Sequence, residues 1–242
     1  MIHDAAAAAV VHAAFEYAGI AFGVALYGRH RRLAGQGGVT QSGTFAAIAG
    51  LLAGAAIGNK AVYLIERPDV WHALLGGQLA LPGQSIVGGL IGGLLGIELA
   101  KALTRQTRSM GDLMVWPLAL GIVIGRIGCL LAGLHDDTYG SATMLPWGVD
   151  FGDGVRRHPT QAYDMLVVVA LAWAVHCRFN DRPGLAFKLF LSGYLAWRLF
   201  IDGFKPVLQP YVLGWSGIQW VCALALLAYA PFVMRAWRPH GA

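Results

Sequence analysis

Two arginines stand out because each lies inside a long apolar stretch of the chain. Arg126 lies within the run 118–134, where glycines flank it, and Arg198 precedes Asp202 by four residues. A charged side chain in apolar surroundings is retained when it has a function or a buried partner. The four-residue spacing places Arg198 and Asp202 on one face of a helix, where they can pair.

Two guanidinium groups of this kind predict a phosphate site. Each presents a planar fork of donors that matches the oxygens of a phosphate, and it can hold negative charge that develops on a leaving group. The alternative is structural, with a buried ion pair joining two helices. Both interpretations remain open at this point.

The composition indicates where such a phosphate would be found. Of the 242 residues, 13% are charged and 57% are hydrophobic, and the mean hydropathy is +0.56. Ordinary soluble domains carry about 25% charged residues, so a soluble enzyme and a disordered chain are both excluded. The net charge of +5 is scattered over short loops, which does not predict nucleic-acid binding. We expect an all-α, polytopic integral membrane protein, in which the abundant phosphate is a phospholipid headgroup.

A membrane-spanning helix needs about 20 mostly apolar residues. The sequence contains seven candidate spans: 6–27, 42–65, 85–100, 112–134, 161–177, 185–204 and 211–234. The stretch 67–84 is expected to be re-entrant or interfacial. The whole chain, 1–242, is predicted to form a single transmembrane domain with an ordered loop at 135–160.

The basic residues predict the orientation. Eleven Lys and Arg fall on the side that holds the C-terminus, four fall on the other side, and three lie within spans. The positive-inside rule then places the C-terminus in the cytoplasm, and the N-terminus and loop 135–160 outside. The third span contains a glycine-rich run at 87–93, which indicates either close helix packing or irregular backbone beside a cavity.

Three motifs, in this order along the chain, resemble the prolipoprotein diacylglyceryl transferase family. They are Gly125-Arg126-Ile127-Gly128-Cys129 with Gly133 and Tyr139-Gly140, then Arg157-His158-Pro159-Thr160-Gln161-Ala162-Tyr163-Asp164, then Tyr194, Arg198, Asp202 and Lys205. The resemblance implies a multi-pass enzyme of the bacterial plasma (inner) membrane. Such an enzyme moves a diacylglyceryl group from phosphatidylglycerol to the lipobox cysteine of a prolipoprotein and releases glycerol phosphate. It implies no cofactor and no metal.

The resemblance also implies a set of site residues. The catalytic ones are Arg126, Arg198, His158 and Asp202. The substrate-binding ones are Tyr17, Gly88, Gly89, Gln161, Tyr163, Tyr194 and Lys205, with the third-span glycines giving room for acyl chains.

The chain departs from the family pattern at the third span. Val87 stands where the family motif has a histidine, and valine cannot accept a proton. We expect His158 to replace that histidine as the base that activates the thiol, with His135 beside Asp136 and Asp137 as the second candidate. Cys129, where many members have asparagine, is expected to be a small packing residue. Two alternative functions stay open, namely the same fold with another acceptor and a non-catalytic phospholipid-binding membrane protein.

Overall fold

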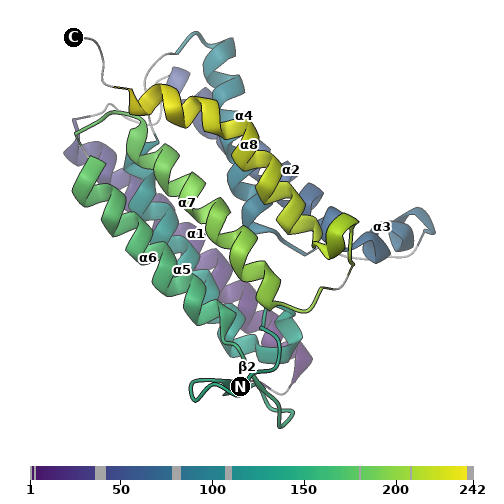
Figure 1. Ribbon diagram of the computed structural model, residues 1–242. Helices are drawn as coiled ribbons and strands as arrows, with labels where there is room; N and C mark the ends of the chain where they lie inside the picture. Colours follow the sequence, from purple (N-terminus) through teal and green to yellow (C-terminus); the bar gives the residue numbers. More distant parts are fainter. Residues whose placement is uncertain are drawn as a thin grey trace. The chain divides into compact units, whose positions relative to one another are not determined.

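The structure, a computed structural model, is built almost entirely from α-helices (Figure 1). It describes Ile2 and residues 4–35, 42–77, 83–106, 111–179, 181–207 and 209–238. The main helices are α1 (Ala5–Leu33), α2 (Ser42–Glu66), α3 (Pro68–Leu75), α4 (Ile86–Leu103), α5 (Val115–Ala132), α6 (Thr160–Phe179), α7 (Leu185–Ile201) and α8 (Gly217–Trp237). The short elements are η1 (Asp112–Met114), η2 (Gly133–Asp136), η3 (Asp202–Phe204), η4 (Val212–Gly214) and the antiparallel strands β1 (Val149–Asp150) and β2 (Arg156–Arg157).

Long apolar helices confirm the expectation of an all-α polytopic membrane protein. Within the described ranges, six helices are long and apolar enough to cross a membrane: α1, α2, α4, α5 with its flanking 3₁₀ turns, α6 and α8. The seventh expected span coincides with α7, which has 17 residues. The count of seven spans therefore stays a prediction. The stretch expected to be re-entrant or interfacial contains α3, and its residues 78–82 lie outside the described part of the chain.

The chain divides into two compact units. Unit 1 comprises Met1–Gly35, Met110–Pro206 and Phe232–Ala242, and unit 2 comprises Gln36–Ser109 and Val207–Pro231. In unit 1, α5 packs against both α1 and α6, and α7 packs against α6 (Figure 1). The expected single transmembrane domain stays a prediction.

Two carboxylates in unit 1 cap the first turns of helices. The carboxylate of Asp112 accepts hydrogen bonds from the backbone N–H groups of Gly184 and Phe187, the latter at 3.0 Å. These N–H groups lie at the start of α7 and have no partner within that helix. Asp4 caps α1 in the same way, because its carboxylate accepts from the N–H of Ala7 at 2.7 Å. The caps fix where α1 and α7 begin.

Unit 2 is held together by glycines at the contact between α2 and α4. A Cβ atom on Gly88 would overlap the carbonyl oxygen of Gly58, and one on Gly92 would overlap that of Gly54. Such stripes of small residues let helix backbones approach closely in a membrane. The glycine-rich run therefore packs against a helix. On the side of Gly88 that faces α2, the backbone of that helix fills the space, and a role of this glycine in substrate binding stays a prediction.

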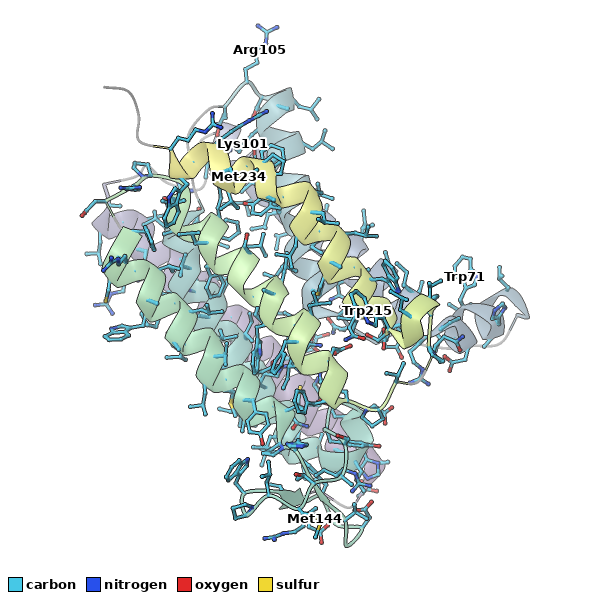
Figure 2. All side chains as sticks on the ribbon, viewed as in Figure 1. Trp71, Lys101, Arg105, Met144, Trp215 and Met234 are labelled. Carbon is cyan, nitrogen blue, oxygen red and sulfur yellow. The ribbon has the colours of Figure 1, made fainter. Side chains whose placement is uncertain are left out.

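The loop at 135–160 is ordered by a short hairpin. Strands β1 and β2 pair, and the Asp150 carboxylate accepts from the N–H groups of Gly152 and Gly154 in the turn between them. Ser141 donates its backbone N–H to the carbonyl of Phe204 at 2.6 Å, which ties the loop to the end of α7. Met144 extends from this loop with 99% of its surface exposed (Figure 2).

Candidate active site

A cluster of five charged side chains lies where α5, α6 and α7 of unit 1 meet. Arg126 Nη2 lies 2.8 Å from Asp164 Oδ2, and Arg198 Nη1 lies 3.0 Å from the same oxygen. Arg198 Nη2 is 3.0 Å from Asp202 Oδ1, which is also 3.7 Å from Lys205 Nζ. The pairing of Arg198 with Asp202 agrees with the prediction from their spacing. We call these five residues the charged cluster.

The charged cluster has more donor capacity and more positive charge than its carboxylates satisfy. Three cationic groups face two carboxylates, which leaves one net positive charge. Among the described residues, the Nε atoms of Arg126 and Arg198 are both buried without a hydrogen-bond partner. Buried polar groups normally have partners, so two orphaned guanidinium donors call for an explanation. An ion pair that serves only to join helices would not need the extra positive charge or the two unpartnered donors.

Lys205 lies at the outer edge of the charged cluster, just after η3. Burial lowers the pKa of its ammonium group to about 8, with repulsion from Arg198 and Arg126 acting in the same direction. Asp202 and Asp164 oppose this shift. An added anion would restore the charged form of the lysine, because opposite charges nearby favour it.

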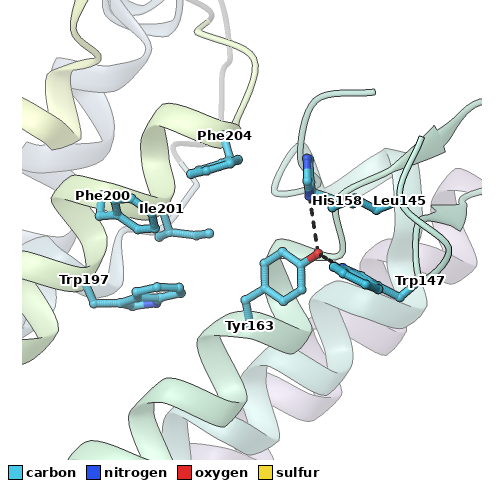
Figure 3. A pocket seen from close by; sticks show the side chains of 8 residues that line it. All are labelled: Leu145, Trp147, His158, Tyr163, Trp197, Phe200, Ile201 and Phe204. Carbon is cyan, nitrogen blue, oxygen red and sulfur yellow. Dashed lines mark hydrogen bonds between the residues drawn. The ribbon is translucent and has the colours of Figure 1, made fainter. Parts of the chain in front are cut away.

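An apolar pocket adjoins the charged cluster within unit 1. Its volume is about 390 Å³, and it is lined by Leu145, Trp147, His158, Tyr163, Trp197, Phe200, Ile201 and Phe204 (Figure 3). Trp197 connects the two features, because its indole N–H donates to Asp164 Oδ1 at 2.7 Å. A charged, donor-rich region and a largely aromatic pocket therefore share one side chain.

His158 lies in the wall of this pocket. Its Nδ1 is 3.3 Å from the hydroxyl of Tyr163, and that hydroxyl accepts a hydrogen bond from Trp147 Nε1 at 2.8 Å (Figure 3). The imidazole also makes an edge contact with the ring of Phe204, with 5.4 Å between the ring centres. Among the described residues, no carboxylate forms a hydrogen bond or ion pair with His158, although a base usually relies on such a group for its orientation.

The other residues expected to bind substrate fall in different places. Tyr194 is fully buried in α7, one turn before Arg198. Gln161 is buried and donates to the hydroxyl of Thr138 at 3.2 Å, so it supports the loop. Tyr17 is 66% exposed on α1.

Two further expected positions, Gly89 and Val87, belong to unit 2. A Cβ on Gly89 would make only ordinary contacts with α2, unlike its neighbour Gly88. Val87 is buried in the first turn of α4, and its side chain offers no proton acceptor.

A second polar group in unit 1 was missed by the sequence reasoning. His12 Nδ1 lies 2.6 Å from Asp136 Oδ1, and the hydroxyl of Thr138 donates to the other oxygen of Asp136. Cys129 completes the group, with the facing atoms of all three side chains within 4.8 Å of one another. Of the expected cluster at His135, Asp136 and Asp137, only the middle residue turns to this position. Cys129 is buried, as expected of a packing residue, but its thiol also has polar neighbours.

This second group adjoins the charged cluster. Cys129 Sγ lies 3.9 Å from Arg126 Nη1, one helical turn along α5. Asp164 was not among the expected site residues, although a lone aspartate in an apolar helix is a signal that the sequence does provide. His12 gave no such signal, because Asp136 is more than a hundred residues away along the chain.

Comparison with known proteins relates this geometry to a family. Residues 8–235 match the model described as prolipoprotein diacylglyceryl transferase. The phosphatidylglycerol–prolipoprotein diacylglyceryl transferase of Rhizobium meliloti (strain 1021) is 28% identical over 209 residues, which cover 79% of this chain and 69% of that protein. The protein of the same name from Dehalococcoides mccartyi (strain ATCC BAA-2266 / KCTC 15142 / 195) is 31% identical over 188 residues, covering 72% and 69%. A third, from Clostridium tetani (strain Massachusetts / E88), is 32% identical and covers 64% of this chain and 65% of its own length. The chain therefore belongs to the prolipoprotein diacylglyceryl transferase family.

Proposed function

We propose that this protein transfers a diacylglyceryl group from phosphatidylglycerol to the thiol of a lipobox cysteine in a prolipoprotein. The observation that carries the proposal is the charged cluster, with its net positive charge and its two buried, unpartnered guanidinium donors. The family relationship supplies the reaction class. The charged cluster supplies the cationic donors that a leaving phosphate group requires.

The reaction needs a cationic site because a phosphate group leaves. The thiolate sulfur attacks the glyceryl carbon that bears the phosphate, the carbon–oxygen bond breaks, and glycerol phosphate departs with the electron pair. Arg126 and Arg198 would hold the charge that accumulates on the leaving oxygen, and such fixed donors act strongly where water is excluded. Asp164 would position both arginines by accepting from each of them.

The lipid itself needs an apolar surface beside the phosphate. The aromatic pocket next to Trp197 offers that surface within unit 1, with Tyr163 and Phe200 in its wall. An amphipathic substrate matches this pairing of a charged region and an apolar pocket. In this role Tyr163 and His158 would contact the lipid, and Lys205 would contact the phosphate end.

The distribution of the basic residues supports one orientation of the protein in the membrane. In unit 2, Lys101 and Arg105 lie at one end and Trp71 and Trp215 at the other (Figure 2). Tryptophan is typical of membrane interfaces and basic residues are typical of the cytoplasmic side. We propose a plasma-membrane protein with its N-terminus outside and its C-terminus inside. Loop 135–160 would then meet the prolipoprotein at the outer surface.

The test is release of glycerol phosphate by the purified protein in phosphatidylglycerol vesicles, with and without a synthetic lipobox peptide. We expect release that depends on the peptide. Arg126→Ala should reduce it by about 10²–10³-fold, the usual effect of removing one donor to a developing oxyanion. Arg126→Lys should recover only part of the rate, because a point charge replaces the fork.

The matched control is Arg67→Ala, which removes an arginine paired with Asp69 on the exposed α3. We expect it to release glycerol phosphate at the wild-type rate. A folded Arg126→Ala protein with wild-type release would refute the role of the charged cluster. Binding of phosphatidylglycerol without any release would instead favour the non-catalytic alternative, and release that ignores the lipobox cysteine would favour another acceptor.

A further inference from the structure

The proposed reaction needs a group that takes the proton of the acceptor thiol, since the thiolate is the nucleophile. The family places a histidine at the position of Val87, and the valine here cannot do this. We propose that His12, oriented by Asp136, is that group. The inference rests on the proposed function, because it names the base of the same transfer.

Asp136 fixes the orientation of the His12 ring. The 2.6 Å distance between Nδ1 and Oδ1 is that of a charge-assisted hydrogen bond, in which Nδ1–H donates to the carboxylate. The second oxygen of Asp136 accepts from the hydroxyl of Thr138, so the carboxylate is itself held in place. In the neutral imidazole with Nδ1 protonated, Nε2 carries the lone pair that can accept a proton. This is the arrangement that orients a histidine base towards a nucleophile in hydrolases and transferases.

The His12 side chain is accessible to an incoming group. Asp136 is buried, with 2% of its side chain exposed, whereas 35% of the His12 side chain is exposed. The orienting carboxylate is thus shielded, and the imidazole remains open to an incoming group. His158, the base expected from the sequence, has an aromatic hydroxyl as its ring partner and shows no comparable pair with a carboxylate among the described contacts.

His12 also lies near the arginine that would hold the leaving phosphate. Cys129 belongs to the same group of side chains as His12, and its sulfur is 3.9 Å from a guanidinium nitrogen of Arg126. A sulfur atom therefore fits between the imidazole and the arginine that would hold the leaving phosphate. Because Cys129 lies close to both His12 and Arg126, its own thiol can be used to test whether His12 accepts a proton.

A metal ion is the competing explanation for three such side chains. Zinc ligands lie about 2.0–2.2 Å from the ion in a tetrahedral arrangement, so two nitrogen or oxygen ligands are separated by roughly 3.3 Å. The 2.6 Å contact between His12 and Asp136 is shorter than this spacing. The two atoms lie at hydrogen-bond distance, and this spacing favours a base over a metal site.

The chemical step balances without a further reactant. Nε2 of His12 takes the proton of the thiol, and the sulfur forms its bond to the glyceryl carbon as the bond from that carbon to the phosphate oxygen breaks. Glycerol phosphate leaves with the electron pair, and Arg126 and Arg198 hold its charge. The imidazolium then returns its proton to water.

The first experiment measures proton transfer to His12 without any lipid. A thiolate is distinguished from a thiol by its ultraviolet absorbance, and the difference between wild type and Cys129→Ser isolates the signal of Cys129. Of the charged groups facing this sulfur, Arg126 and Asp136 are present in both backgrounds, so a comparison with His12→Gln reports on the imidazole alone. We expect the Cys129 thiolate signal of the wild-type background to be changed by His12→Gln when both proteins are compared at the same pH.

The second experiment measures transfer to the lipobox peptide. His12→Gln should slow it by about 10²–10⁴-fold, the usual contribution of a general base. His12→Ala should be partly rescued by added imidazole, which a purely structural histidine would not allow. His176→Gln is the matched control, because His176 lies in the last turn of α6 beside Trp116 and we expect it to transfer at the wild-type rate.

Several results would overturn the inference. They are a Cys129 thiolate signal that His12→Gln leaves unchanged, unimpaired transfer by His12→Gln, and a stoichiometric metal ion that His12→Gln loses. If the wild-type protein releases no glycerol phosphate, the proposed function fails. In that case the thiolate measurement still decides whether His12 accepts a proton from a thiol.

Discussion

The substitution Asp164→Asn removes the one negative charge that Arg126 and Arg198 share. It breaks ion pairs of 2.8 and 3.0 Å while leaving an amide oxygen that can still accept from Trp197. Removing one partner of a buried ion pair costs about 3–5 kcal/mol, because the remaining charge is buried without compensation. Here two guanidinium groups lose their common partner, and the net charge of the charged cluster rises from one to two.

The assay is thermal unfolding of the detergent-purified protein, followed by tryptophan fluorescence. A loss of this size lowers the unfolding midpoint by on the order of 10 °C for a chain of this length. Inorganic phosphate should raise the midpoint of Asp164→Asn more than that of wild type, because the anion replaces the missing carboxylate. Asp153→Asn is the matched control, since it breaks an exposed pair with Arg157 in the loop and should leave the midpoint unchanged. An unchanged midpoint in Asp164→Asn, or equal protection by phosphate, would refute this reasoning.

Three further predictions concern charge, packing and orientation. Because the pKa of Lys205 is lowered to about 8, the lysine loses its charge as the pH rises through this value. The KM for phosphatidylglycerol should therefore rise above pH 8, and Lys205→Arg should remove this dependence. A KM that varies equally with pH in both proteins would contradict it. Gly58→Leu places a side chain against the carbonyl of Gly88 and should abolish folding of unit 2. The control Gly28→Leu places its side chain where no neighbouring atom lies, and it should fold. Equal yields of folded protein from the two variants would contradict the described contact between α2 and α4. Reporter fusions at Arg32 and Gly152 should report cytoplasm and exterior respectively, and the same compartment for both would disprove the orientation.

The helices could be predicted from the sequence because apolar runs of this length carry a strong signal. Each expected span overlaps one of the helices α1, α2 and α4 to α8. The pair of Arg198 with Asp202 was also predictable, because residues four apart lie next to each other on one face of a helix. The close packing of the glycine-rich run was one of two options, and only the partner helix decides between them.

The contacts that join distant segments could not be predicted in this way. Asp164 lies 34 residues from Arg198, and their meeting depends on how α6 packs against α7. The pairing of His12 with Asp136 depends on α1 lying beside the end of α5, and no periodicity connects these positions. The motif of His158 is local and can be recognised in the sequence, whereas a histidine with a remote orienting carboxylate gives no such signal.

The central claim is that the charged cluster serves transfer of diacylglyceryl to a protein thiol. The most direct test is the intact mass of a lipobox peptide after incubation with the purified protein and phosphatidylglycerol, compared with a peptide whose cysteine is replaced by serine. We predict that the cysteine peptide gains the mass of one diacylglyceryl group through a thioether, that the serine peptide gains nothing, and that Arg198→Ala abolishes the gain. A folded wild-type protein that leaves the cysteine peptide unmodified, or a folded Arg198→Ala protein that modifies it at the wild-type rate, would contradict the claim.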